Sequence, residues 1–262
     1  MRPNTLRELL RAGKPTFGTH MNLAVPALVE AIGHTGMYDY VEFVAEYATY
    51  DLHDLDNLCR AAELYSLSSI IKIDQAPRTF TAQRAIGSGF QGVLFADVRT
   101  VEDARECVRV VRPETPSDGG LYGAASRRFA YPSYGGSPEY VQALRDVVVV
   151  LMIEKQSTVE SLEEILSVPG VDMIQWGPVD FAMSSGRAGA GRSTEVQAVE
   201  RQVIATALRL GVAPRAEIGS VEQAQYYLDL GVRHFCMGWD FGVLYQWWRS
   251  NGVKLRQLVG EG

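Results

Sequence analysis

Long apolar stretches are missing from this sequence. Nowhere does it approach the roughly 20 uninterrupted apolar residues that a helix needs to cross a bilayer. Its first 18 residues also lack the continuous apolar segment and the cleavage site of a secretory signal peptide. We therefore expect a cytoplasmic protein without membrane contact.

Basic residues and cysteines are also few. There are 25 Lys and Arg against 31 Asp and Glu, a formal charge of -6, and no basic run that could follow a phosphate backbone. We expect no nucleic-acid partner. The three cysteines, Cys59, Cys107 and Cys236, lie far apart without CxxC or Cys/His spacing, so we interpret them as reduced core residues.

The chain alternates between short apolar runs and amphipathic helical patterns. It contains neither GxGxxG nor GxxxxGK[ST], which disfavours a doubly wound nucleotide-binding sheet. Eight βα units in about 260 residues are typical of a (β/α)8 TIM barrel, and we expect one such domain over residues 1–262. The candidate strands span residues 16–21, 40–45, 69–73, 92–96, 147–153, 173–177, 212–216 and 234–238.

One segment interrupts this rhythm. Residues 112–138, between the fourth and fifth candidate strands, are rich in Gly, Pro, Ser and Tyr. A loop of this length inside a compact domain is more often functional than structural. We expect it to contact the second substrate of an enzyme, together with a neighbouring subunit.

Two carboxylates at adjacent strand ends indicate a metal site. Glu154 follows the apolar strand 147–153, and Asp180 follows the next strand after Gly177. The strand ends lie about 5 Å apart, so both side chains could hold one hard divalent cation. An alternative interpretation makes one acid a surface residue and the other the N-cap of the following helix.

The stretch MIEKQSTVESLEEILSVPGVDMIQWGPVDFAMSSG, which begins two residues before Glu154, resembles the metal-binding core of the HpcH/HpaI aldolase family. The resemblance extends over most of the chain, including GMYDYVEFVAEYA and YLDLGVRHFCMGWDFGVL. It implies a TIM barrel, Mg²⁺ or Mn²⁺, with Co²⁺ as a further option, on Glu154 and Asp180, and a hexamer of this chain. It also implies a pyruvate-like 2-oxo acid substrate bound at Gly177, Pro178, Val179 and Asp180, with backbone N–H groups receiving its carboxylate.

Three positions depart from the family pattern. Tyr47 stands where the family has a histidine base, Lys72 where it has a substrate-binding arginine, and Gly87 where it has an aspartate. Lys72 keeps a positive charge but loses the bidentate guanidinium fork, while a tyrosine is a poor base at neutral pH. Tyr47 could donate a hydrogen bond to substrate or serve only in packing.

His20, at the end of the first candidate strand, is a candidate to replace the missing base; the alternative is a histidine that only shapes the pocket. The main functional hypothesis is a metal-dependent carbon–carbon lyase or synthase that acts through a metal-stabilised enolate. Three alternatives remain open: a diverged decarboxylase or condensing enzyme, a Schiff-base aldolase using Lys72, and a silent binding protein. The helix expected over Asp240–Leu258, with Tyr245, Trp247 and Trp248, indicates a subunit contact.

Overall fold

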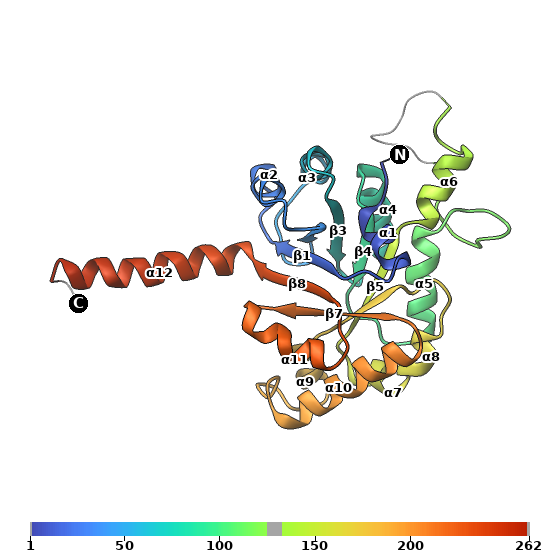
Figure 1. Cartoon of the computed structure of the whole chain (residues 1–262). Coiled ribbons are helices and arrows are strands. Elements are labelled where there is room, and N and C mark those ends of the chain that lie inside the picture. Colours follow the sequence, from blue (N-terminus) through green and yellow to red (C-terminus); the bar gives the residue numbers. More distant parts are fainter. Residues whose placement is uncertain (1, 125–132, 261–262) are drawn as a thin grey trace.

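Eight parallel strands form a closed barrel in the computed structural model, which describes residues 2–124 and 133–260 (Figure 1). Each strand pairs with its neighbours in chain order, and β8 closes on β1. The TIM barrel predicted from the sequence is therefore confirmed. The strands are β1 (Thr16–Met21), β2 (Tyr40–Val44), β3 (Ser68–Ile73), β4 (Gly92–Phe95), β5 (Val148–Ile153), β6 (Met173–Trp176), β7 (Ala213–Ile218) and β8 (His234–Trp239).

Helices connect and surround the strands, and several begin at side chains that satisfy the first free N–H groups. Asp51 and Asp54 form a capping box at α3, and Thr100 and Asp103 form another at α5. The helices are α1 (Thr5–Arg11), α2 (Pro26–His34), α3 (Leu52–Leu64), α4 (Arg78–Ser88), α5 (Val101–Val111), α6 (Pro138–Arg145), α7 (Gln156–Glu160), α8 (Leu162–Leu166), α9 (Pro178–Ser184), α10 (Thr194–Arg209), the 3₁₀ turn η1 (Val221–Gln223), α11 (Ala224–Asp229) and α12 (Asp240–Leu258).

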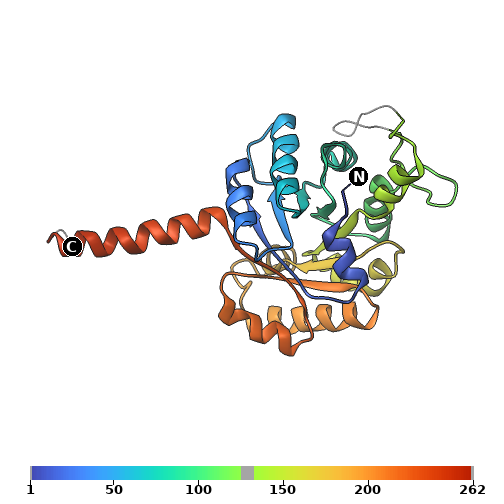
Figure 2. The same ribbon diagram turned by 45° about the horizontal axis from the view of Figure 1, so that its top comes forward.

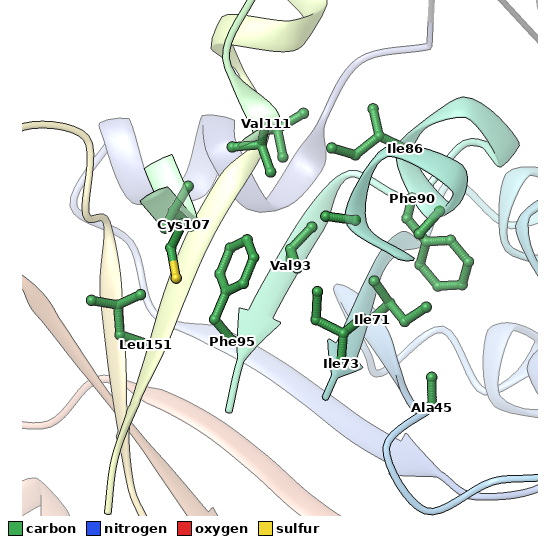
Figure 3. Close-up of a cluster of buried hydrophobic side chains, with 14 of the residues drawn as sticks. Ala45, Ile71, Ile73, Ile86, Phe90, Val93, Phe95, Cys107, Val111 and Leu151 are labelled. Atoms are coloured by element: carbon green, nitrogen blue, oxygen red, sulfur yellow. The ribbon is translucent and has the colours of Figure 1, made fainter. Parts of the chain in front are cut away.

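The main apolar core lies between the strands and the surrounding helices. Phe95 on β4 and Cys107 on α5 belong to it, as Figure 3 shows. All three cysteines are buried and none of them forms a disulfide, as expected. A second cluster fills the barrel interior and includes Leu6 of α1, which is fully buried. Asn4, just before α1, donates to the carbonyls of Gln91 and Asp146, so α1 closes the end where the strands begin.

The described part of residues 112–138 lies away from the pocket of its own chain, and the expected contact with a second substrate across a neighbouring subunit stays a prediction. The segment follows helix α5 and leads through α6 into β5, so it connects a helix to a strand. Such connections lie at the N-terminal end of a barrel, opposite the end where active sites form. Of its described part, no residue lines the pocket at the C-terminal strand ends. Residues 125–132 lie outside the described structure.

Helix α12 projects away from the barrel in both views (Figures 1 and 2). None of its residues is buried, and apolar side chains such as Trp247 and Trp248 are more than half exposed. Within the described residues, no helix combines the length and apolar character that a membrane span requires.

Candidate active site

A pocket of about 520 Å³ opens at the C-terminal ends of the strands. It brings together every residue that the sequence analysis proposed for catalysis, substrate binding or metal binding. These are His20, Tyr47, Lys72, Glu154, Gly177, Pro178, Val179 and Asp180. Gly87, which the sequence resemblance places where the family has an aspartate, instead lies buried in α4 and does not line this pocket.

Glu154 is held rigidly at the end of β5. It is 4% exposed, and its Oε1 accepts a hydrogen bond from the backbone N–H of Asp97 at 2.8 Å. Burial raises the pKa of Glu154, while the Asp97 N–H and the charge of Lys72 act in the opposite direction. A buried carboxylate of this kind needs a cation nearby to remain charged.

Gly177 leaves the space that the Glu154 side chain occupies. A Cβ atom at position 177 would lie 2.7 Å from the Glu154 Cβ and 2.8 Å from its Oε2. Such distances are too short for any side chain, so glycine is required here for packing. Among the described residues, no hydrogen bond reaches Glu154 Oε2, which leaves this oxygen available to a ligand.

Asp180 lies in the first turn of α9 with its side chain 42% exposed. Its Oδ1 accepts from Lys155 Nζ at 2.7 Å, and the same ammonium lies 2.7 Å from Asp97 Oδ1. The N-cap of α9 is Gly177, without a side-chain cap. The alternative interpretation of a surface acid and an N-cap acid is therefore wrong, because Glu154 is buried and the N-cap of α9 is Gly177 rather than Asp180.

The two carboxylates fit a divalent cation. The charge of Asp180 contributes to raising the pKa of Glu154, which places the two groups within electrostatic reach. Carboxylate oxygens are the donors that Mg²⁺ and Mn²⁺ prefer, and the pocket leaves room for water and substrate oxygens. The sequence analysis assigned no role to Lys155 or Asp97, although both are polar residues that follow strands.

Lys72, at the end of β3, forms an ion pair with Glu46. Nζ lies 2.7 Å from Glu46 Oε2, and both side chains are largely buried. Burial lowers the pKa of Lys72, but the paired carboxylate outweighs this effect and the net pKa is raised. A Schiff-base lysine must be neutral to attack a carbonyl, so this arrangement disfavours the Schiff-base alternative.

Tyr47 stands beside this ion pair and is 65% exposed. The Lys72 ammonium lies 4.9 Å from the centroid of its ring. Partial burial raises the pKa of Tyr47, although Lys72 acts in the opposite direction. The phenol is therefore neutral at physiological pH, where it can donate a hydrogen bond but cannot act as a base.

His20 lies at the barrel mouth on β1, the strand that pairs with β2. The bulge in the pairing of β1 with β8 falls between Gly18 and His20. The His20 Nδ1 lies 3.8 Å from Glu217 Oε1 and 3.9 Å from the Cys236 Sγ, and its ring lies 6.2 Å from that of Trp239. His20 thus faces polar groups inside the pocket rather than the apolar core.

A group of inward-facing polar residues, which we call the inner polar cluster, consists of Glu42, Gln175, Arg215 and Glu217. Arg215 Nη1 lies 2.5 Å from Glu42 Oε2 across the barrel, and both side chains are buried. Arg215 also donates to Gln175 Oε1, and Gln175 Nε2 donates to Glu217 Oε2 at 2.8 Å. No role was predicted from the sequence for any residue of this cluster. Polar residues within the strands YVEFV, MIQW and APRAEI were the signal for them.

Residues 16–245 match the HpcH/HpaI aldolase/citrate lyase family. The chain belongs to this family. It is 28% identical to a hydroxypyruvate/pyruvate aldolase of Paraburkholderia phytofirmans over 244 residues, which covers 90% of this chain and 92% of the relative. It is also 28% identical to a 4-hydroxy-2-oxo-heptane-1,7-dioate aldolase of Escherichia coli, covering 92% and 90% of the two chains.

The crystal structure of an HpcH/HpaI aldolase/citrate lyase family protein from Burkholderia cenocepacia superimposes with a TM-score of 0.86 at 29% identity. The match covers 97% of this chain and all of the other. The resemblance drawn from the sequence is confirmed. The expectation of a carbon–carbon lyase agrees with the names of the two aldolases.

Proposed function

We propose that this family member makes and breaks a carbon–carbon bond next to the keto group of a pyruvate-like 2-oxo acid, in an aldol-type reaction. The observation that carries the proposal is the buried Glu154 carboxylate beside Asp180, with Gly177 leaving space for it. The two carboxylates would hold Mg²⁺, Mn²⁺ or Co²⁺. When bound, the cation supplies a Lewis acid that stabilises negative charge on oxygen.

The first turn of α9 would receive the carboxylate of the substrate. Phe181 is the first residue of α9 whose N–H bonds within the helix, to the carbonyl of Gly177. The N–H groups of Val179 and Asp180 therefore remain available, and both residues line the pocket. Free N–H groups at the start of a helix favour anions.

Lys72 and Tyr47 would orient the keto end of the substrate. The Lys72 ammonium is fixed by Glu46 and stays charged, so it can attract an oxygen that gains negative charge. Tyr47 can add one O–H donor from the same wall. Neither side chain can accept a proton at neutral pH, which leaves His20 as the candidate base in the pocket.

The reaction balances without an oxidant or a reductant. In the synthetic direction, carbon 3 of the 2-oxo acid loses a proton and becomes an enolate. That carbon then forms a bond to the carbon of an aldehyde, and the aldehyde oxygen takes up a proton to become a hydroxyl group. Cleavage reverses these steps.

We also propose that the chain assembles as a hexamer. The exposed apolar side chains of α12 would be covered by other copies, since soluble proteins rarely expose so large an apolar patch. In a symmetric homo-oligomer every copy makes the same contacts, so the same face of α12 would be covered in each copy.

Two measurements test the proposed chemistry. We expect wild-type protein to bind Mn²⁺ in calorimetry and, with Mn²⁺, to exchange the methyl protons of pyruvate for deuterium in D₂O without any aldehyde. Glu154→Gln and Asp180→Asn should abolish binding and exchange while the circular dichroism spectrum is preserved. His20→Gln should keep Mn²⁺ binding but slow exchange by about 10²- to 10⁴-fold, the usual loss of a general base.

The exposed Glu164→Gln on α8 serves as the control and should behave as wild type. Unchanged Mn²⁺ binding in the Glu154, Asp180 double variant would refute the metal site. Decarboxylation of oxaloacetate without any methyl exchange of pyruvate would favour the decarboxylase alternative, because that reaction requires no proton abstraction from carbon.

A further inference from the structure

The wall of the pocket formed by β7, β8 and the end of β1 has no role in the chemistry proposed above, apart from His20. It presents Glu217, Trp239 and Asn22 to the cavity. The Glu217 side chain and the Trp239 residue are each 45% exposed, so both are open to a ligand. This wall lies apart from Glu154 and Asp180, which come from β5 and α9.

Glu217 has one carboxylate oxygen engaged and one available. Its Oε2 accepts from Gln175 Nε2 at 2.8 Å, which fixes the orientation of the carboxylate. Its Oε1 lies 3.8 Å from His20 Nδ1, beyond hydrogen-bond distance. An incoming O–H group could therefore donate to Oε1 without displacing a bond that the protein already makes.

The positive charges around the cavity are already paired. Within the described part of the chain, Lys72 and Arg215 are the lysine and arginine side chains that line the pocket. Lys72 is paired with Glu46 at 2.7 Å, and Arg215 with Glu42 at 2.5 Å. A second carboxylate on the substrate would thus meet Glu217 without a free cation to compensate, at a considerable electrostatic cost.

Trp239 supplies the apolar part of this wall. Its ring lies 6.2 Å from that of His20, and its indole face can pack on the C–H groups of a small ligand. A carboxylate oxygen next to an exposed aromatic ring suits a molecule with hydroxyl groups on a short carbon chain. An unsubstituted aldehyde would leave Glu217 without a new partner.

We infer that Glu217 and Trp239 form the subsite for the second substrate, and that this substrate is an uncharged, hydroxylated aldehyde. The inference rests on the aldol chemistry proposed above. Glu217 is the residue that determines specificity, because it accepts a hydroxyl proton and repels a carboxylate.

The test compares kcat/KM for three aldehydes with pyruvate and Mn²⁺: glyceraldehyde, propanal and 4-oxobutanoate. Glyceraldehyde and propanal share a three-carbon chain, and 4-oxobutanoate carries a carboxylate. We expect wild type to prefer glyceraldehyde over propanal by about 10- to 100-fold, as a hydrogen bond to a charged group predicts. Glu217→Gln should reduce this ratio by about 5- to 10-fold, because the amide oxygen is a weaker acceptor, and should improve the relative rate with 4-oxobutanoate.

His20→Gln is the matched control. Because His20 would act on the enolate that both aldehydes share, its loss should slow the two reactions equally and leave their ratio unchanged. The exposed Glu222→Gln should alter neither rates nor ratio. A wild-type preference for 4-oxobutanoate, or an unchanged ratio in Glu217→Gln, would overturn the inference. Absence of methyl exchange in wild type would instead refute the aldol chemistry itself.

Discussion

His234 should make the stability of this barrel depend on pH. It begins β8, where its Nδ1 lies 3.0 Å from Thr16 Oγ1 on the neighbouring strand. Burial lowers the pKa of His234 to about 4 from an ordinary 6.5, and the charges of Arg233 and Arg215 act in the same direction. The native state therefore holds a neutral imidazole over a pH range in which the unfolded chain binds a proton.

The direction of this pH dependence follows from the linkage between proton binding and folding. Well above pH 6.5, as at pH 7.5, neither state is appreciably protonated at this residue, and its contribution to stability is complete. As the pH falls below 6.5, the unfolded state takes up the proton first, so the free energy of unfolding decreases until the native state also protonates near pH 4. The gap of about 2.5 pKa units predicts a loss of about 2.5 kcal/mol between pH 7.5 and pH 4.5.

Urea unfolding at pH 7.5 and pH 4.5 measures this effect. Other groups also titrate in this range, so wild type is compared with His234→Asn, whose amide can still bond to Thr16 but does not titrate. The wild type should lose about 2.5 kcal/mol more than His234→Asn on acidification. The exposed His53→Asn should lose as much as wild type. Equal losses in wild type and His234→Asn would refute the reasoning.

Two further predictions concern the metal site and the assembly. Gly177→Ala should displace the Glu154 carboxylate and weaken Mn²⁺ binding in calorimetry by about 10- to 100-fold. The control Gly252→Ala on α12, where a Cβ meets nothing within 4 Å, should bind Mn²⁺ as wild type does. Equal affinities in the two variants would contradict the packing argument. The exchanges Trp247→Glu and Trp248→Glu on the exposed face of α12 should lower the mass measured by light scattering below that of a hexamer. A monomeric wild type at micromolar concentration would refute the assembly.

Much of the fold could be predicted because its signals are local. Each buried strand leaves a short apolar run in the sequence, and a parallel barrel places every strand end at one edge. Glu154 and Asp180 could be brought together by this rule alone, since β5 and β6 are neighbours both in the chain and in the sheet. The bounds of β7 were predicted less accurately: the candidate strand spans residues 212–216, whereas β7 begins at Ala213 and continues through Glu217 to Ile218.

Contacts across the barrel could not be predicted in the same way. Glu42 and Arg215 lie on β2 and β7, which do not pair, and no local pattern reports which inward residues meet across the interior. The same limit applies to Lys155, because its partner Asp97 follows β4 and its partner Asp180 lies in α9 after β6. The position of the loop at 112–138 could not be predicted either, because its length indicates irregular structure but does not state at which end of the barrel it lies.

Tyr47 and Lys72, which the sequence resemblance places where the family has histidine and arginine, are best understood together with Glu46. A lysine alone in a buried site would lose its proton, and its charge would be lost with it. Glu46, at 2.7 Å, keeps Lys72 charged, and Lys72 in turn lies over the ring of Tyr47. This wall of the pocket therefore offers a positive charge that can attract a substrate oxygen, but no base. β1 and β7 carry His20 and Glu217, which we propose handle a proton and select the second substrate.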